Sequence, residues 1–523
     1  MKKSHNNRRR IGGDIWWPAL VAFAVKLLLT PSYRSTDFEV HRHWLALTHS
    51  LHISRWYSDA TSPWTLDYPP FFAYFEKFLS VIASRVDPTA TDLHRGLDYA
   101  SPATILFQRI SVALSDVVLV CAAYRLTINR GFSRFERFLI WGLVIWSPGL
   151  FIVDHLHFQY NGFLLGMLLL SISFLEEGRD LLGGLVFAVL LCFKHLFAVA
   201  APVYFVYMSR HYCRGGFVKG FGRLVLMGSV VVAVFGAAYG PFCISRVTLQ
   251  IQQILHRLFP FGRGLCHAYW APNGWVFYIM LDKSLAFLLV KLGFNIQAPK
   301  ASFTGGLVGD SSPFAVLPTV TIFDHPFDYF HHGYLAISPC LVKAWKNPQP
   351  RMVSRWISYA YTCGFLFRWH VHEKASLHFV IPLATTSLKS VEDTKHYFML
   401  SIVSCYSLFP LLYEAQEHPI KILLLLLHTV LILFGFSSRF TGKTATTVKE
   451  SDRKLENSAF HIGWLGKSYL LGLLTVEIWG QFLHPIVFGE RLPFLPLMMI
   501  SIYCAIGMVY SWIWQLKMIC LNQ

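Results

Sequence analysis

The chain has 523 residues, of which 54% are hydrophobic and only 14% are charged, and its mean hydropathy is +0.44. Soluble globular proteins carry about 25% charged residues, so the composition argues against the alternative of a soluble multidomain enzyme. The net charge of +17 does not indicate a nucleic-acid partner, because Lys and Arg occur in short clusters between apolar runs, as in cytoplasmic loops. The sequence therefore predicts an all-α polytopic membrane protein, with ~20 residues for each crossing of ~30 Å of hydrocarbon.

The chain begins with a basic tail, residues 1–14, followed by an apolar run at 16–29 and a polar stretch at 37–76. A cleaved signal peptide is the alternative for the apolar run, but no small-residue cleavage site follows it. We expect the tail in the cytosol and the polar stretch, as part of a first loop at 33–102, on the lumenal side of the endoplasmic reticulum.

Further spans are predicted at 103–123, 138–153 and 162–175, which brings the polar segment 154–161 to the same face. The next apolar segment, 181–208, is too short for two full spans and is interrupted by Lys194. We expect a pair of short helices here. One long tilted helix with a snorkelling Lys194 is the alternative.

After a span at 224–239 we expect a lumenal loop region at 240–312, in which 274–294 forms a helix at the membrane interface because it contains three charged residues. Segment 321–332 contains two Asp, three His and a Pro, which would be costly inside a span, so we expect a broken helix or an atypical segment there. The C-terminal region, 375–521, is predicted to form apolar helices at 380–388, 397–412, 420–436, 464–482 and 493–516.

Six polar motifs occur in chain order at 36–44 (TDFEVHRHW), 64–71 (WTLDYPPF), 157–162 (HFQYNG), 193–195 (FKH), 258–265 (LFPFGRGL) and 372–374 (HEK). Together they resemble the glucosyltransferases of the endoplasmic reticulum that use dolichyl-phosphate glucose to build the lipid-linked N-glycan precursor. Within that family, segment 266–273 (CHAYWAPN) is similar to the members that add the second glucose, onto the monoglucosylated precursor.

The resemblance implies one integral-membrane glycosyltransferase domain of the GT-C type at 1–523, with a lumenal active site built from loops and short interfacial helices. It implies transfer of glucose from dolichyl-phosphate glucose to the terminal glucose of a dolichyl-pyrophosphate-linked oligosaccharide, with inversion to an α-1,3 linkage and without a cofactor. The implied partners are these two lipids and the membrane lipids of the endoplasmic reticulum. Two alternatives stay open: a sister enzyme that adds the first glucose or a mannose, and a transporter of lipid or sugar.

Asp37 is the expected catalytic residue, because it matches the family's aspartate in the 36–44 motif and an inverting displacement needs a base on the acceptor hydroxyl. Its alternative role is that of a helix N-cap. The donor phosphate is expected to contact His372, and the predicted substrate-binding set is Asp67, Arg109, His157, His267, Trp270, His370, His372 and Glu373. Paired histidines such as 155/157 and 370/372 also allow a metal site, but no acid with matching spacing is present and we expect none. Cys243 and Cys266 are the pair that could form a lumenal disulfide.

Overall fold

The computed structural model describes residues 15–243, 247–259, 271–296, 315–318, 326–368, 371–444, 460–489 and 491–521. These residues form helices joined by loops, and no strand occurs among them. The all-α fold class predicted from the composition is therefore confirmed.

The chain divides into two compact units, and each is described by itself. The first unit comprises Met1–Pro260, Ala344–Ser354 and Leu411–His428. The second comprises Phe261–Lys343, Arg355–Pro410 and Thr429–Gln523. That the whole chain acts as one glycosyltransferase domain stays a prediction.

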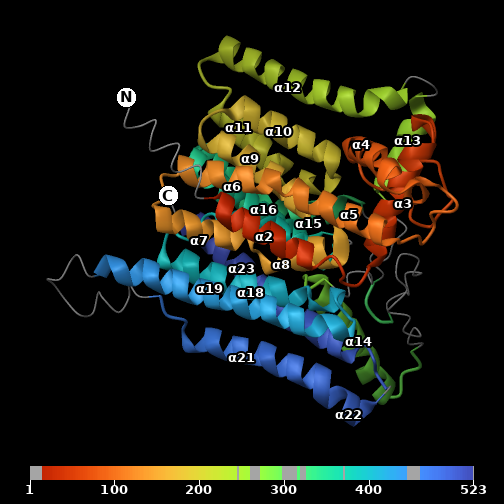
Figure 1. Ribbon diagram of the computed structural model, residues 1–523. Coiled ribbons are helices and arrows are strands. Elements are labelled where there is room, and N and C mark those ends of the chain that lie inside the picture. The colour runs from red at the N-terminus through yellow and green to blue at the C-terminus, as the bar shows by residue number, and fades with distance from the viewer. Residues whose placement is uncertain are drawn as a thin grey trace. The chain divides into compact units, whose positions relative to one another are not determined.

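The first unit begins with thirteen longer or site-forming helices among its described residues, which Figure 1 labels for the most part. In chain order they are α2 (Trp16–Leu28), α3 (Thr36–Ser50), α4 (Pro70–Val86), α5 (Pro102–Ser115), α6 (Val117–Asn129), α7 (Arg134–Ile145), α8 (Pro148–Leu150), η3 (Phe151–Phe158), α9 (Asn161–Glu176), α10 (Asp180–Phe193), α11 (Ala201–His211), α12 (Phe217–Tyr239) and α13 (Val247–Leu258).

The second unit holds the described helices that follow, three of which share residues with the first unit along the chain. They are α14 (Trp275–Lys291), α15 (Pro326–Lys346), α16 (Val353–Phe367), η8 (Glu373–Ser376), α17 (Leu377–Ala384), α18 (Val391–Ser407), α19 (His418–Thr444), α21 (Trp464–Ile478), η11 (Trp479–Leu483), α22 (His484–Phe488) and α23 (Leu495–Leu521).

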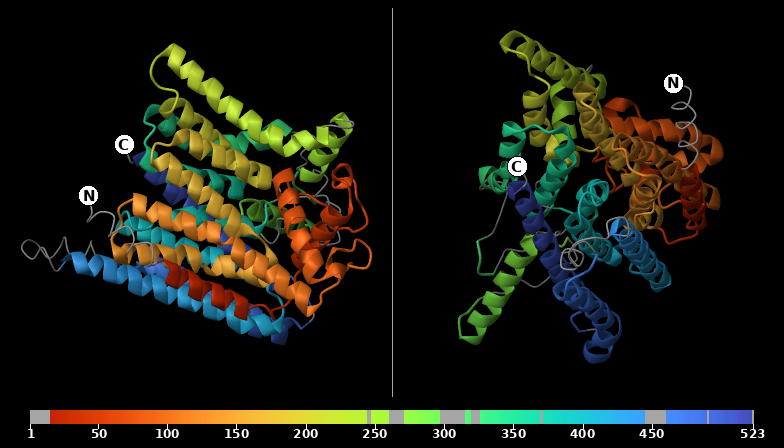
Figure 2. Two further views of the ribbon diagram at one scale, coloured as in Figure 1. Left: turned by 45° about the horizontal axis from the view of Figure 1, so that its top comes forward. Right: turned by 90° about the vertical axis from the view of Figure 1, so that its left-hand side faces the viewer.

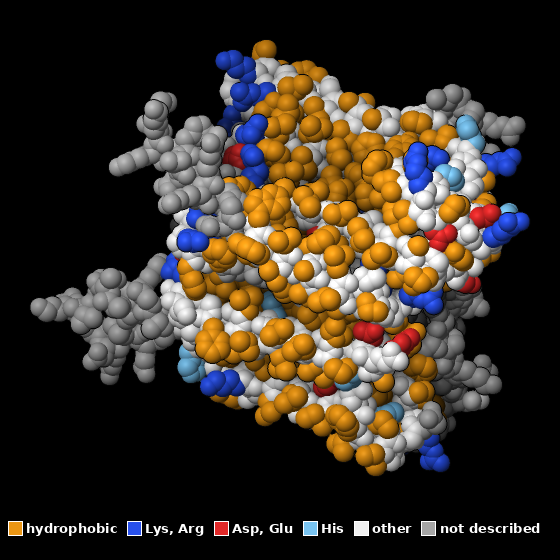
Figure 3. Space-filling model, in the orientation of Figure 1, with side chains coloured by type: hydrophobic (Ala, Val, Ile, Leu, Met, Phe, Trp, Pro, Cys, Tyr) orange, Lys and Arg blue, Asp and Glu red, His pale blue; other side chains and the backbone are white. Residues whose placement is uncertain are grey.

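Six helical stretches of the described chain are long and apolar enough to cross a membrane. They are Pro102–Asn129, Arg134–Phe158, Phe217–Cys243, Ala415–Phe440, Trp464–Phe488 and Leu495–Leu521. Each overlaps a span predicted from the sequence, so the polytopic architecture is supported by helix length and composition. Side chains on α12 illustrate the pattern, since Figure 3 shows hydrophobic side chains over this helix and Lys and Arg near its end.

Lys194 interrupts the apolar segment 181–208, as predicted. Helix α10 ends at Phe193, and Lys194 adopts extended backbone angles, φ −149° and ψ 109°. A 3₁₀ turn, η4 (His195–Ala200), then leads into α11. The pair of short helices is therefore confirmed, and one continuous tilted helix is wrong. The interfacial position predicted for 274–294, which forms α14, stays a prediction.

The polar stretch 37–76 folds as two packed helices, α3 and α4, at one end of the first unit's apolar helices (Figures 1 and 2). Pro69 precedes α4 and Pro70 begins it, which is where the ring is tolerated in a helix. Trp44 and Phe72 lie at the centre of the hydrophobic cluster between these helices, with 2% and 0% of their surfaces exposed. Trp44 is thus a core residue, and its indole is not available for stacking on a sugar.

Candidate active site

Asp37 lies in the first turn of α3, directly after the loop that follows α2. The preceding Ser35 has extended backbone angles, φ −75° and ψ 168°, and its hydroxyl donates to the carbonyl oxygen of His157 instead of capping the helix. Asp37 is the second helical residue, so the alternative in which it serves as the N-cap is wrong. A carboxylate in the first turn is stabilised by the positive end of the helix dipole.

Two side chains from one segment hold the Asp37 carboxylate. Gln159 Nε2 donates to Asp37 Oδ2 over 2.7 Å, and His157 Nε2 lies 3.2 Å from the same oxygen. The amide of Gln159 is oriented by Asn161, whose Nδ2 donates to Gln159 Oε1 over 2.8 Å. Because Oδ2 accepts from Gln159, this oxygen carries no hydrogen of its own.

Tyr33 contacts the other nitrogen of His157. Its hydroxyl lies 2.9 Å from His157 Nδ1 and 2.6 Å from the carbonyl oxygen of Leu411, a residue of the same unit. A tyrosine hydroxyl has one hydrogen, and the short contact to the carbonyl oxygen requires it. Burial is the largest cause that raises the pKa of Tyr33 well above its ordinary value, so the phenol is neutral. Nδ1 of His157 is therefore the donor to Tyr33.

These contacts define the protonation of His157. With a hydrogen on Nδ1, a neutral imidazole would direct a bare lone pair from Nε2 toward the Asp37 carboxylate. Two acceptors at 3.2 Å would repel each other, whereas a hydrogen on both nitrogens satisfies both contacts. The geometry therefore fits an imidazolium at His157 beside an ionised Asp37.

A strained backbone aims His157 and Gln159 at α3. Both follow or end the π-helical turn η3, and Phe158 between them has φ +94°, a left-handed conformation that bulky residues rarely adopt. Such a conformation costs roughly 1 to 3 kcal/mol. Packing holds it in place, since the Phe158 ring is fully buried and meets the Phe38 ring at a centroid distance of 5.3 Å.

Arg109 anchors the same turn. Its Nη1 donates to the carbonyl oxygens of His155 and Leu156 over 2.5 and 3.1 Å, and its Nη2 donates to the carbonyl oxygen of Tyr33 over 3.0 Å. The guanidinium is 3% exposed and thus ties the loop before α3 to the turn that carries His157. A contact between Arg109 and the donor phosphate stays a prediction, but its described hydrogen bonds all go to the backbone.

A buried cation lies on the far side of Gln159. Lys194 Nζ donates to Asn161 Oδ1 over 3.2 Å and lies 5.2 Å from the centre of the Tyr68 ring. The pKa of Tyr68 is raised by burial and then by the nearby carboxylates of Asp67 and Asp37. Tyr68 is thus the side chain that connects the predicted Asp67 electrostatically with the Asp37 site.

An ion triad supports η3 from within the apolar helices. Lys26 Nζ lies 2.5 Å from Asp116 Oδ2, and His155 Nε2 lies 2.9 Å from the same oxygen. All three side chains are buried, and Asp116 is the junction between α5 and α6. Charged groups among apolar helices are costly unless paired, so the triad positions His155, two residues before His157.

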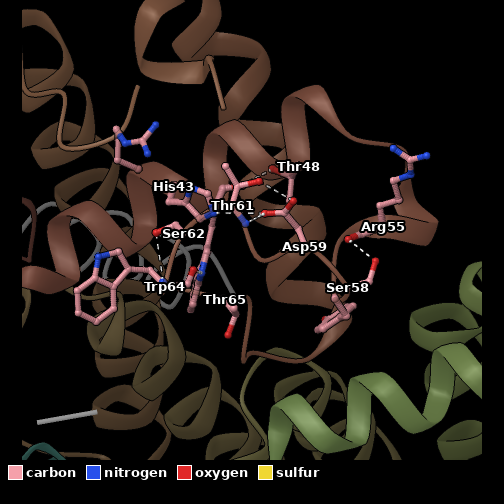
Figure 4. Close-up of polar contacts among 12 residues, drawn as sticks. His43, Thr48, Arg55, Ser58, Asp59, Thr61, Ser62, Trp64 and Thr65 are labelled. Carbon is pink, nitrogen blue, oxygen red and sulfur yellow. Dashed lines mark hydrogen bonds and ion pairs between the residues drawn. The ribbon is translucent and has the colours of Figure 1, made fainter. Parts of the chain in front are cut away.

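The remaining acids of the polar stretch have partners within it. Glu39 accepts three hydrogen bonds from the Arg42 guanidinium, and buried Glu76 lies 2.7 Å from His41 Nδ1. Figure 4 shows the loop around Asp59, whose carboxylate accepts from the backbone and hydroxyl of Thr61. These acids order the region around α3.

The predicted residues of the second unit are only partly described. His372 is the residue before the 3₁₀ turn η8, and Glu373 is 5% exposed in that turn. His267, Trp270 and His370 lie outside the described residues, as do Cys266 and most of segment 321–332, so the predictions for them stay untested.

The histidine pair proposed as metal ligands divides between two partners. His155 pairs with Asp116, whereas His157 pairs with Asp37 and Tyr33. Among the described residues, no group of three His, Cys, Asp or Glu side chains is arranged to hold a metal ion.

Comparison with known families matches residues 22–515 to the ALG6, ALG8 glycosyltransferase family. This match covers nearly the whole chain. The chain belongs to the ALG6, ALG8 glycosyltransferase family. The resemblance read from the six sequence motifs is thereby confirmed at the level of the family, and the chain is an enzyme of the glycosyltransferase class.

Curated relatives of this ALG6, ALG8 family member are similar over almost their full lengths. A protein of Arabidopsis thaliana is 66% identical over 503 residues, covering 96% of this chain and 97% of the relative. Relatives from Mus musculus and Schizosaccharomyces pombe are 42% and 40% identical, with at least 95% of each chain covered. All three are named dolichyl pyrophosphate Glc1Man9GlcNAc2 alpha-1,3-glucosyltransferase.

Proposed function

We propose that this chain transfers glucose to the glucose-terminated Glc1Man9GlcNAc2 oligosaccharide on dolichyl pyrophosphate and forms an α-1,3 linkage. The observation that carries this proposal is the 66% identity over 96% of the chain to a relative with that name. We further propose that the glucose donor is dolichyl-phosphate glucose and that the enzyme resides in the endoplasmic reticulum membrane, with a cytosolic N-terminus and a lumenal active site.

Asp37 acts as the general base in this proposal. It accepts the proton of the acceptor 3-hydroxyl on Oδ1, the oxygen that the Gln159 and His157 contacts do not use. The acceptor oxygen forms a bond to C1 of the donor glucose from the face opposite the phosphate, which inverts the anomeric centre. The bond from C1 to the phosphate oxygen breaks, and dolichyl phosphate leaves with the electron pair.

The leaving phosphate is already a stable anion, so no acid has to protonate a poor alkoxide. Hydrogen-bond donors or cations suffice to stabilise the charge that develops on it. His372 stays our candidate for this contact, with Arg109 and His370 as further candidates. The activated donor also explains why we expect no cofactor.

His157 and Gln159 position Asp37 in this mechanism. Both place a donor on Oδ2, so the carboxylate has one orientation and stays ionised before transfer. Preorganised side chains of this kind keep the base within reach of its proton.

The test uses purified full-length protein with dolichyl-phosphate glucose and two lipid-linked acceptors, one without glucose and one with a single glucose. We expect transfer only to the monoglucosylated acceptor, with the new linkage identified as α-1,3 by linkage-specific glucosidase digestion. Transfer to the unglucosylated acceptor alone would favour the sister activity. Movement of the lipids across vesicles without any transfer would favour a transporter.

A further inference from the structure

A pocket of about 810 Å³ opens in the first unit beside the beginning of α3. Its walls are the loop 30–36, the segment 98–100 with the first turns of α5, and the side chains of Trp64 and Glu414. Pockets of this size accept ligands of the size of a drug molecule or a short oligosaccharide. Nothing in the mechanism above uses this space.

The pocket adjoins the residue that carries the base. Thr36 and Phe38, the two chain neighbours of Asp37, both line it, and so does Tyr33, whose hydroxyl contacts His157. A ligand in the pocket therefore lies against the first turn of α3. A sugar chain held there can extend past this turn to place its terminal residue at Asp37.

The charges of the pocket exclude a phosphate. Three carboxylates line it, those of Glu39, Asp98 and Glu414, against one exposed guanidinium, that of Arg34. Glu39 is neutralised locally by Arg42. In the described chain, the side-chain carboxylates of Asp98 and Glu414 make no hydrogen bond or ion pair with other residues. Two ionised carboxylates without partners repel the phosphate of the donor and the pyrophosphate of the acceptor.

The same groups suit a neutral polyol. An ionised carboxylate is purely a hydrogen-bond acceptor, with two oxygens that can each receive hydroxyl hydrogens. Trp64 and Tyr99 add aromatic surface against which the apolar face of a sugar ring packs. Figure 4 shows the Trp64 indole on the side of its loop away from Asp59, free of that polar cluster.

We infer that this pocket binds the neutral, hydroxyl-rich arm of the acceptor oligosaccharide immediately behind the reacting glucose, with Asp98 and Glu414 accepting hydrogen bonds from its hydroxyls. The inference rests on the proposed function, because it takes the acceptor to be a lipid-linked oligosaccharide. It adds the place where the acceptor is recognised.

Steady-state kinetics of full-length Asp98→Gly and Glu414→Ala proteins test the inference. Asp98 has φ +56°, a conformation that glycine adopts without strain, so the first variant keeps the backbone. We expect the KM for the monoglucosylated acceptor to rise about tenfold in each variant, as for the loss of a hydrogen bond to a charged group. The KM for the donor and the melting temperature stay unchanged. Glu392→Ala, which removes an exposed acid at the beginning of α18, is the control and leaves all three values unchanged.

A rise in the donor KM alone, or no change in either KM, would overturn the inference. Binding of the free oligosaccharide, released from both lipid and pyrophosphate and measured by saturation-transfer NMR, separates this result from a failure of the proposed function. Wild-type protein should bind this glycan, and the double variant should not, whether or not glucose is transferred. Equal binding by both proteins would refute the pocket as its site.

Discussion

The most informative single change is His157→Gln. His157 connects Tyr33 to Asp37 through contacts of 2.9 and 3.2 Å, and the contact geometry requires a hydrogen on both ring nitrogens. Glutamine can still donate one hydrogen bond to Asp37, but it has no charge. The variant therefore separates the electrostatic role of His157 from a purely steric one.

The size of the effect follows from the charges. Two unit charges 3.2 Å apart attract by about 5 kcal/mol at an effective dielectric constant of 20, before the cost of desolvation. Solvent reaches 11% of the His157 and 22% of the Asp37 side chain, which screens the pair in part. Neighbouring opposite charges commonly shift the ionisation of a carboxylate by about 1 to 3 pH units. We expect an effect near the lower end, of about 1 to 2 units.

The direction of the effect is determined by the state in which the base works. Asp37 accepts a proton only when it is ionised, so activity is lost as pH falls and the carboxylate becomes protonated. Without the positive charge of His157, protonation occurs at higher pH. The acid limb of the kcat profile should therefore move to higher pH by about 1 to 2 units, with little change in the KM of either substrate.

The assay measures initial rates of glucose transfer from pH 5 to 9, with His52→Gln, an exposed histidine of the same loop region, as the matched control. The control should keep the wild-type profile. A His157→Gln profile with lower kcat but an unmoved acid limb would show that His157 is not a charged partner of Asp37, and the assignment of its protonation would be wrong.

Two further predictions concern stability. Lys26→Met leaves Asp116 buried beside His155 alone, and breaking a buried ion pair typically costs about 3 to 5 kcal/mol, so the melting temperature in detergent should fall by several degrees; an unchanged value would show that the triad does not hold η3. Burial, with Arg42 as a second cause, lowers the pKa of His43 from 6.5 to about 4. The unfolded chain therefore binds a proton that the folded protein refuses between these values, and stability should fall as pH decreases from 6.5 toward 4. His43→Leu should flatten this dependence of the melting temperature on pH, and a variant with the wild-type slope would contradict the cause.

Much of the scaffold could be predicted from the sequence because hydrophobic length is a direct signal of a membrane span. The predicted span at 138–153 lies within the helical stretch Arg134–Phe158, and the break at Lys194 followed from a charge inside an apolar segment. Both features depend on local composition, which a single sequence contains.

The supports of Asp37 were not predictable in the same way. Gln159 is a neutral residue 122 positions from Asp37, and its approach depends on the left-handed backbone of Phe158, which no propensity rule assigns to phenylalanine. Tyr33 was passed over as part of a short connecting loop. The motif HFQYNG contained the signal, since it lists His157 and Gln159 together, but their common target is visible only in the folded chain.

Arg109 shows the opposite limit. A buried cation near the lumenal end of a span suggests a phosphate ligand, yet the structure directs its guanidinium to three carbonyl oxygens. Sequence patterns do not distinguish a cation that serves the substrate from one that satisfies the backbone, because both need the same residue type at the same depth.

The account depends most directly on Asp37 as the base, and single-turnover transfer by Asp37→Asn measures that claim. Asparagine keeps the shape of the side chain and can still contact His157, but it cannot accept the hydroxyl proton. With donor and monoglucosylated acceptor both saturating, we predict a loss of about 10²- to 10⁴-fold in the rate of transfer by a protein with the wild-type melting temperature. Near-normal transfer by the folded Asp37→Asn protein would contradict the account.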